Sequence, residues 1–323
     1  MTSPIALTCG EPAGAGAELT VKAWRELGND IPFFWIGDPR HLPAGTEIAE
    51  ISDPAEVRDT GDRLAVLRHE FSGPAHPGVP NPNHAQDVID IIARAVSLVI
   101  GGRASAVCTN PIHKKTLMDG AGFTYRGHTE YLAALAGVDR VVMMLVCNAL
   151  KVVPATLHIP LEQVKTHLTR PLLVDTLRIT HVGLMRDFGV QAPRLAVAGM
   201  NPHAGEGGAI GREEIEIIQP ALASLRGEGL NVTGPLSADT MFHPGARAGY
   251  DAAICMYHDQ ALIPIKTLDF ARGVNVTLGL PFIRTSPDHG TALDIAGRGI
   301  ADPSSLIEAL RLAHAMARRR AST

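Results

Sequence analysis

Short apolar runs recur along the chain without the polar alternation that marks a half-exposed strand. Unbroken apolar runs are typical of strands that are covered on both faces. We therefore predict strands over residues 5–8, 33–36, 106–109, 141–146, 152–156, 195–199, 252–256 and 274–278.

Apolar residues at helical spacing separate several of these strands. One such stretch covers residues 88–99, behind Asn83 as a predicted N-cap. Residues 213–225 predict a second helix, whose acidic first turn complements the helix dipole. Asp302 and Pro303 supply the cap and first-position proline of a last helix. This alternation predicts an α/β fold, an α/β/α sandwich around a largely parallel sheet, with ligands at the carboxyl ends of its strands.

Composition excludes several classes of protein. A chain of 323 residues suits two domains of ordinary size or one large intertwined unit, and it can bury a core without disulfides. A net charge of −4 and 4% aromatic residues argue against a surface for nucleic acid or anionic membranes. The start, MTSPIALTCG, lacks the segments of a signal peptide, and no apolar run is long enough to span a bilayer. We therefore expect a soluble, cytoplasmic protein.

Four isolated cysteines, Cys9, Cys108, Cys147 and Cys255, show no Cys-x-x-Cys spacing. We predict four reduced thiols near strand ends. A catalytic thiol at Cys108 or Cys255 is the alternative.

A glycine-rich loop, TCGEPAGAGAELT, joins the first predicted strand to a helix. With Asp38 after the next strand, it has the general form of a dinucleotide fingerprint. However, Gly10, Gly14 and Gly16 are spaced G-x-x-x-G-x-G, and Pro12 stiffens the turn that a pyrophosphate would approach. We therefore expect no Rossmann site here. The loop is either a turn whose glycines supply positive φ or the lining of a cleft.

Three predicted strands are each followed by a histidine: His158, His203 and His258. A single histidine at a strand end is most often a structural hydrogen-bonding group. Three at the carboxyl edge of one sheet favour a divalent metal held by three imidazoles with an open position. No two of them have i, i+4 spacing, so the sequence pattern leaves their convergence open.

A second group of residues is suited to an anionic substrate. His128 and Thr129 lie in a glycine-containing turn that opens a helix, where backbone N–H groups and the dipole favour phosphate. Lys266, Asn275 and Arg284 follow in later segments, and arginine suits bidentate contact with phosphate or carboxylate. Each of these side chains is, alternatively, an ordinary surface group.

Seven motifs run in order along nearly the whole chain, from Gly10 to about Gly299. They are GEPAGAGAE, NPIHK, GHTEY, MNPHAGEGG, GPLSADTMF, MYHDQ and GVNVTLGLPFIRTSPDHGTA, of which the last is highly specific. Together, these motifs closely resemble the 4-hydroxythreonine-4-phosphate dehydrogenase family of vitamin B6 biosynthesis. Ala15 and Ala17 stand where the family often has Ile and Pro, which affects the entry into a helix.

The resemblance implies an isocitrate/isopropylmalate dehydrogenase-like fold, not a Rossmann fold, with two α/β/α domains and a shared cleft. Residues 1–127 and 276–323 would form the first domain. Residues 128–275 would form the second, with the interface of a homodimer. Each active site would lie at the subunit interface and use NAD or NADP.

The resemblance also implies roles for individual residues. His158, His203 and His258 match the family's ligands for one divalent metal (zinc, magnesium or cobalt). Asp239, in SADTMF, matches a cleft aspartate. The family's substrate-binding residues match His128, Thr129, Lys266, Asn275 and Arg284.

The implied reaction is the oxidation of 4-phosphooxy-L-threonine to 2-amino-3-oxo-4-phosphooxybutanoate, which decarboxylates to 3-amino-2-oxopropyl phosphate. A divalent cation would stabilise negative charge on the alcohol oxygen, and the nicotinamide would accept the hydride. Either Lys266 or Asp239 would relay the proton. Asp259 would orient the imidazole of His258.

Three alternative functions are consistent with the same residues. One is a sister dehydrogenase that acts on threonate or erythronate 4-phosphate. Another is a tri-histidine metallohydrolase that acts on phosphate esters without NAD. The third is a non-catalytic protein that binds metal or phosphate. Three imidazoles favour zinc or cobalt over magnesium without deciding between them.

Overall fold

The computed structural model describes residues 2–28 and 30–322. The chain divides into two compact units, with unit 1 made of Met1–Asp139 and Leu280–Thr323 and unit 2 of Arg140–Gly279. Both are α/β units. The divisions fall after residues 139 and 279, whereas the resemblance implied divisions after residues 127 and 275. The segment of His128 and Thr129 accordingly belongs to unit 1.

The sheet of unit 1 has the strand order β3-β4-β2-β1-β5-β12, and every neighbouring pair is parallel. All residues of β1 and β5 are buried, so both faces of the sheet are covered, as the unbroken apolar runs predicted. The strands are β1 (Ile5–Thr8), β2 (Phe33–Gly37), β3 (Ile48–Ile51), β4 (Leu64–Arg68), β5 (Ala106–Thr109) and β12 (Arg284–Pro287).

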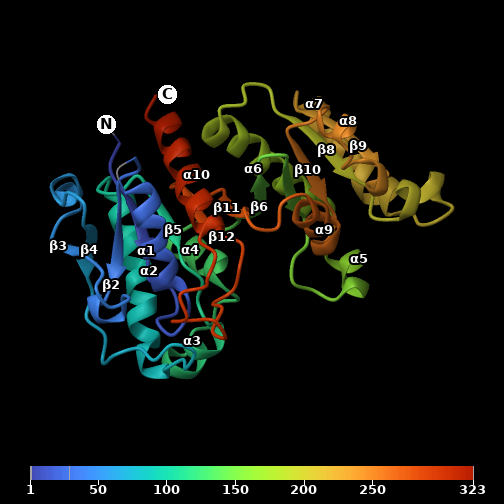
Figure 1. The fold of residues 1–323 in the computed structure, drawn as a ribbon. Coiled ribbons are helices and arrows are strands. Elements are labelled where there is room, and N and C mark those ends of the chain that lie inside the picture. Colours follow the sequence, from blue (N-terminus) through green and yellow to red (C-terminus); the bar gives the residue numbers. More distant parts are fainter. Residues whose placement is uncertain (1, 29, 323) are drawn as a thin grey trace. The chain divides into compact units, whose positions relative to one another are not determined.

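Two groups of helices cover this sheet (Figure 1). Helix α10 packs on β12 and β5 beside α1, while α2 packs on β1 and β5 beside α3 and α4. Both α1 and α2 bury an apolar face, which is the main source of helix stability in a folded protein. The helices are α1 (Gly16–Leu27), α2 (Ala85–Ile100), α3 (Lys114–Ala121), α4 (His128–Ala136) and α10 (Ser304–Arg320).

The sheet of unit 2 has the strand order β11-β6-β7-β10-β8-β9. Strand β6 is antiparallel to both of its neighbours, and β7, β10, β8 and β9 are parallel. The largely parallel sheet was therefore predicted correctly, apart from β6. The strands are β6 (Val142–Cys147), β7 (Leu150–Pro154), β8 (Arg194–Ala198), β9 (Asn231–Leu236), β10 (Ala252–Cys255) and β11 (Val274–Leu278).

Helix α9 packs on β7 and β10 and anchors its first residue, His258, to the core of unit 2. Its Ala261 and Ile265 are buried with Val152 and Cys255 in one apolar cluster. Helix α6 packs on β6 and β11 and against α7. The helices are α5 (Val164–His167), α6 (Arg170–Phe188), α7 (Gln219–Gly227), α8 (Pro244–Arg247) and α9 (His258–Leu268).

Several helix starts differ from the prediction. The Asn83 cap is wrong: the side chain of Asn81 accepts the Asn83 N–H and caps a 3₁₀ turn over Pro82–His84, after which α2 begins at Ala85. The helix predicted over residues 213–225 opens with a π-helical turn, Glu214–Ile218. The side chain of Asp302 accepts the Ser304 N–H, so α10 begins one residue later than predicted.

The four cysteines are free, as predicted, and all four are buried. Burial raises the pKa of the Cys108 thiol to about 12 and also raises the pKa of Cys255. Both thiols are therefore protonated at neutral pH, which argues against the catalytic-thiol alternative. Within the described part of the chain, no helix has the length and apolar character needed to cross a membrane.

Candidate functional site

The three predicted histidines of unit 2 follow three neighbouring strands. His158 comes after β7, His258 opens α9 directly after β10, and His203 comes after β8. Because β7, β10 and β8 are adjacent and parallel, their carboxyl ends lie along the same edge of the sheet. The fold therefore brings segments that lie far apart in sequence to one edge.

Hydrogen bonds join these three segments. The Thr156 hydroxyl donates to the Met256 carbonyl at 2.7 Å, which ties the segment after β7 to the end of β10. The buried amide of Gln260 accepts the Met256 N–H at 2.7 Å and donates to the Gly199 carbonyl, after β8, at 2.8 Å. Sequence reasoning missed both side chains. Only the "MYHDQ" motif pointed to Gln260.

His158 and His258 lie side by side, with ring centroids 5.7 Å apart. They border a pocket of about 270 Å³ together with Tyr257 and Asp259. Nδ1–H of His258 donates to a carboxylate oxygen of Asp259 at 2.7 Å, the contact expected from the sequence. This hydrogen bond leaves Nε2 of His258 as the atom with a lone pair.

His203 borders an adjacent pocket of about 320 Å³, which shares Tyr257 with the first pocket. His203 and His158 both have φ near 50°, in the left-handed region. This conformation costs a residue with a side chain roughly 1–2 kcal/mol and is concentrated at functional sites. The two backbone outliers support a functional role for this edge.

The histidines fit a divalent cation in part. Two imidazoles on one tetrahedral ion would have ring centroids roughly 5 Å apart, close to the observed spacing of His158 and His258. The free Nε2 of His258 is also a suitable donor. However, residues 2–28 and 30–322 contain no group of three or more His, Cys, Asp or Glu side chains arranged to hold a metal ion. His203 as the third ligand therefore stays a prediction.

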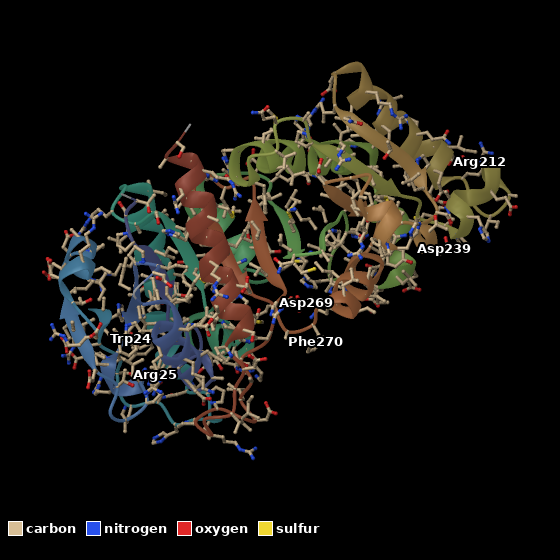
Figure 2. All side chains as sticks on the ribbon, turned by 45° about the horizontal axis from the view of Figure 1, so that its top comes forward. Trp24, Arg25, Arg212, Asp239, Asp269 and Phe270 are labelled. Carbon is tan, nitrogen blue, oxygen red and sulfur yellow. The ribbon has the colours of Figure 1, made fainter. Side chains whose placement is uncertain are left out.

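Lys266 lies two turns along α9 from His258. Both border a third pocket of unit 2, of about 530 Å³. The Lys266 ammonium lies 5.4 Å from the ring centroid of Phe270, which projects from the loop after α9 and is 78% exposed (Figure 2). Lys266 thus shares this pocket with one of the predicted metal ligands, His258.

Asp239 lies in a 3₁₀ turn, Ala238–Thr240, and borders the pocket of His203. The Ser237 hydroxyl donates to its carboxylate at 2.5 Å and lowers its pKa, and the charge of His203 adds to this effect. Asp239 is therefore ionised at neutral pH, and it is a weaker base than an ordinary aspartate.

Asn275 lies in β11, opposite Leu145 of β6. Its Oδ1 atom is buried and accepts no hydrogen bond within the described part of the chain. A buried amide oxygen of this kind normally has a partner. Asn275 is therefore a candidate for contact with a ligand.

Unit 1 contains a buried cation. Arg284 opens β12, is 3% exposed, and donates through Nη2 to the Thr109 hydroxyl at 2.8 Å. Burial lowers the pKa of this guanidinium to about 10, so it stays charged at neutral pH at an energetic cost. A bound anion would offset that cost, which fits the predicted anion-binding role.

His128 opens α4 beside Thr129, at the predicted glycine-containing turn. Its Nε2 atom is buried and has no hydrogen-bond partner among the described residues, although the residue as a whole is half-buried. Burial, followed by the positive charge of Arg284, lowers the pKa of His128 well below its usual range. The imidazole is therefore neutral.

We predict that His128 makes the protein less stable in mild acid. Below about pH 6.5 the unfolded chain protonates this histidine and the folded chain does not, so the free energy of unfolding falls as pH falls, by up to about 1.4 kcal/mol per pH unit. His41, His84 and His314 have lowered pKa values and act in the same direction.

Urea unfolding at several values between about pH 5 and pH 7 tests this prediction. His128→Gln should flatten the pH dependence. The matched control is His167→Gln, at an exposed position of α5. Equal slopes for the His128→Gln variant and the unmodified protein would contradict the prediction.

The glycine-rich loop after β1 packs closely against other segments of unit 1. A Cβ at Gly10 would lie 2.6 Å from the Pro111 carbonyl oxygen, and one at Gly14 would lie 2.6 Å from that of Thr291, so only glycine fits at these two positions. Asp38 accepts the Phe71 N–H and pairs with the Arg40 guanidinium. The expectation that no dinucleotide binds at this loop stays a prediction.

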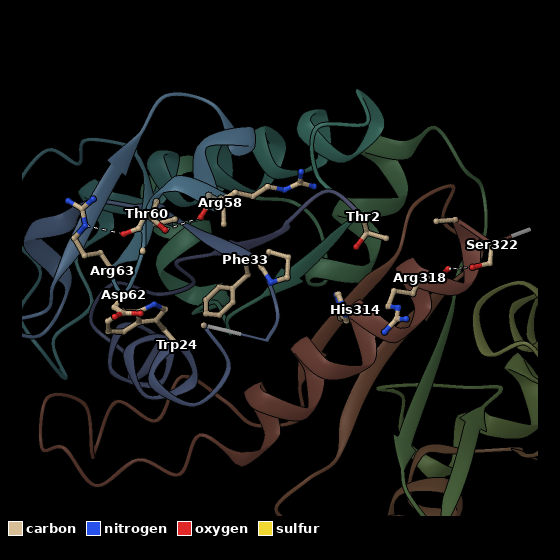
Figure 3. Close-up of a pocket in the computed structure, with 16 residues that line it drawn as sticks. Thr2, Trp24, Phe33, Arg58, Thr60, Asp62, Arg63, His314, Arg318 and Ser322 are labelled. Atoms are coloured by element: carbon tan, nitrogen blue, oxygen red, sulfur yellow. Dashed lines mark hydrogen bonds between the residues drawn. The ribbon is translucent and has the colours of Figure 1, made fainter.

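A larger pocket, of about 860 Å³, lies in unit 1 (Figure 3). Thr2, Trp24, Phe33 and Arg318 are among its lining residues. It lies at the amino-terminal ends of β1, β2 and β4, whereas parallel sheets bind ligands at the carboxyl ends. None of the predicted site residues lines it, so we place the candidate site elsewhere.

Fold and site together define a two-unit α/β protein. One unit carries a histidine-rich sheet edge, and the other carries a buried arginine beside a neutral histidine. The comparisons with known proteins place this arrangement in a family.

Residues 31–313 match the family described as pyridoxal phosphate biosynthetic protein PdxA. A protein of Roseobacter denitrificans named 4-hydroxythreonine-4-phosphate dehydrogenase is 61% identical, over 98% of both chains. The crystal structure of the Klebsiella pneumoniae protein of that name is 38% identical, covers 98% of this chain and 100% of its own, and has a TM-score of 0.90. The structure of a terephthalate 1,2-cis-dihydrodiol dehydrogenase from Burkholderia xenovorans is 26% identical, covers 98% of each chain and has a TM-score of 0.69.

The chain belongs to the PdxA family of pyridoxal phosphate biosynthetic proteins. The resemblance read from the motifs is therefore confirmed, and so is the α/β fold class.

Proposed function

We propose that this protein is an NAD- or NADP-dependent dehydrogenase of 4-phosphooxy-L-threonine. The product, 2-amino-3-oxo-4-phosphooxybutanoate, loses CO₂ to give 3-amino-2-oxopropyl phosphate. The observation that carries the proposal is the 61% identity, over nearly the whole chain, to a protein named for this activity. The K. pneumoniae structure of the same name supports it, with a TM-score of 0.90.

The anionic substrate requires cationic partners, and we assign this role to Arg284 and Lys266. Arg284 of unit 1 is buried and charged, and its planar guanidinium suits a phosphate or carboxylate group. The neutral His128 beside it is available as a hydrogen-bond donor or acceptor. Lys266 of unit 2 is the second cation, and we assign Thr129 and Asn275 to substrate hydroxyl or amine groups.

A divalent metal ion held by His158, His203 and His258 would stabilise negative charge on the alcohol oxygen and, later, on the oxygen of the keto group. A neighbouring carboxylate orients one of these imidazoles for metal binding. Asp259 accepts Nδ1–H of His258 at 2.7 Å, so the lone pair of the neutral imidazole lies on Nε2. Nicotinamide dinucleotide supplies the hydride acceptor.

The two candidates for proton transfer differ in basicity. The hydrogen bond from Ser237 lowers the pKa of Asp239 and makes it the weaker base. We therefore assign the proton transfer to Lys266. Its neutral amine would accept the proton of the substrate hydroxyl, and the ammonium group formed in this way would return a proton to the carbon that has lost CO₂.

A homodimer in the cytoplasm is part of the same proposal. On and after α9, Ile263 is 63% exposed and Phe270 is 78% exposed, and both border the pocket of Lys266. Exposed apolar side chains gathered around a functional pocket are typical of a protein–protein contact.

The proposed function is tested by following the absorbance of reduced nicotinamide and the release of CO₂. The purified protein is mixed with NAD or NADP, a divalent cation and 4-phosphooxy-L-threonine. We expect both products to form together, and we expect a chelator to stop the reaction until metal is restored. A chelator-resistant reaction would contradict the metal assignment.

The alternative functions give different results in the same assay. Faster turnover of threonate or erythronate 4-phosphate would identify the sister dehydrogenase. Release of inorganic phosphate without reduced nicotinamide would identify a hydrolase. Substrate binding without turnover would identify a non-catalytic binding protein.

A further inference from the structure

The loop that carries His203 has an unusual backbone. From His203 to Gly207, five successive residues have positive φ values, between 44° and 77°. Glycine adopts this conformation freely, but His203, Ala204 and Glu206 do not. Because a run of left-handed residues does not persist alone, other contacts must hold this turn in place.

One buried carboxylate holds the start of the turn. Glu214 is 1% exposed, and its Oε1 accepts the backbone N–H groups of Met200 and Asn201, each at 2.8 Å. Its Oε2 accepts the side-chain amide of Asn201 at 2.9 Å. These three donors lie directly between the end of β8 and His203. Hydrogen bonds to a charged acceptor are stronger than those between neutral groups.

The glycines of the loop leave room for this carboxylate. A Cβ at Gly205 would lie 2.5 Å from Oε2 of Glu214, and one at Gly199 would lie 3.1 Å from Oε1. The carboxylate is therefore enclosed by the loop that it holds. Glu214 is also the first residue of the π-helical turn Glu214–Ile218, and such turns are frequent at functional sites.

The same network reaches the segment after His158. The amide of Asn201 also donates to Glu213 at 2.7 Å, and Glu213 pairs with Lys165 of α5 at 2.7 Å. Val164, the neighbour of Lys165, borders the pocket of His158 and His258. These polar contacts therefore connect the turn of His203 to α5, the helix that follows the segment of His158.

We propose that Glu214 is a positioning residue, which fixes the left-handed turn of His203 and thereby sets the affinity of the histidine site for a divalent cation. This inference rests on the proposed function, since it assumes that His203 is a metal ligand. It concerns a residue that is not expected to contact the metal or the substrate. Its effect would pass through the Met200–Asn201 backbone.

Titration with Co²⁺ tests the inference without relying on activity, because the visible absorption of bound Co²⁺ reports its coordination. Glu214→Gln preserves the size of the side chain but places a donor against the Asn201 amide. We expect its affinity for Co²⁺ to fall about 10- to 100-fold, the usual effect of residues that orient metal ligands. Glu214→Asp should restore part of that loss.

A matched control separates positioning from general stability. Asp187 is another buried carboxylate of unit 2, and it is bonded to Arg186. Asp187→Asn should lower the melting temperature without changing the affinity for Co²⁺. If Glu214→Gln does not fold, Gly205→Ala provides the second test, since its added Cβ would displace the carboxylate and weaken Co²⁺ binding similarly.

The outcomes distinguish the two proposals. The test of Glu214 requires that the unmodified protein binds Co²⁺ and that His203→Ala does not. Under that condition, unchanged Co²⁺ affinity in Glu214→Gln would overturn the positioning role. If Glu214→Gln does not fold, unchanged affinity in Gly205→Ala would overturn it instead. If the unmodified protein and His203→Ala bind Co²⁺ equally, the assumed ligand is wrong, and the metal part of the proposed function fails with it.

Discussion

His258→Ala is expected to abolish divalent-cation binding at the histidine site and to reduce turnover more than about 100-fold. The magnitude follows from the smaller effect of outer-sphere residues, whose loss already costs about 10- to 100-fold in affinity or activity. His258 has the best-prepared imidazole of the three, since Asp259 accepts its Nδ1–H at 2.7 Å and leaves Nε2 free. Isothermal titration with Zn²⁺ and initial rates with NAD measure the two effects.

Two further variants serve as comparisons for His258→Ala, one with a smaller expected loss and one with none. Asp259→Asn should cause an intermediate loss, because an amide no longer fixes the tautomer of His258 as firmly. His181→Ala, on α6 of the same unit, should bind Zn²⁺ normally. A His258→Ala variant with normal Zn²⁺ affinity and normal turnover would remove this histidine from the proposed metal site.

The sequence predicted which segments reach the carboxyl edge of the unit 2 sheet, but it did not predict the order of the strands that carry them. Unbroken apolar runs located β7, β8 and β10, and parallel strands place their carboxyl ends together. The histidine after each run was therefore correctly expected at one edge. The order β7-β10-β8 could not be predicted, because it depends on crossover connections that no local pattern records.

Local sequence patterns could not predict the roles of Gln260 and Glu214, because both side chains bind partners that only the folded chain brings close. Gln260 connects the ends of β10 and β8, and the partner that it reaches, Gly199, is 61 positions away in the chain. Glu214 was assigned only to an acidic first turn, which complements a helix dipole. In the folded chain its carboxylate is buried and accepts the N–H groups of Met200 and Asn201. A hydrogen bond of this kind exists only once the sheet has formed.

Strands β3, β4, β9 and β12 were not predicted, and β12 was missed because the prediction relied on apolar runs. Strand β12, with the sequence RTSP, contains no aliphatic residue, yet all four of its residues are buried. It pairs with β5, and α10 packs against it. This packing excludes water from the hydroxyl groups of the strand. Thr285 satisfies its hydroxyl by donating to the Ala309 carbonyl at 2.9 Å. This polar strand positions Arg284, so the gap in the prediction fell on a candidate site residue.

The second large effect is expected at Arg284. Arg284→Met keeps the volume of the side chain and removes the charge. If the guanidinium binds the substrate anion, the KM should rise about 30- to 5,000-fold, which corresponds to the roughly 2–5 kcal/mol typical of a buried charged contact. Arg284→Lys should recover only part of the loss, since an ammonium lacks the planar bidentate geometry.

Thermal stability separates binding from folding in this variant. Burial lowers the pKa of Arg284 to about 10, so the free protein carries a cation that its surroundings disfavour. Replacing such a charge by an apolar side chain of similar size is often neutral or stabilising. We therefore expect the melting temperature of Arg284→Met to stay level or rise while substrate binding weakens. Arg58→Ala, at an exposed position of unit 1, is the control with normal KM. A normal KM in Arg284→Met would exclude the anion-binding role, and a lower melting temperature would show that Arg284 mainly stabilises the fold.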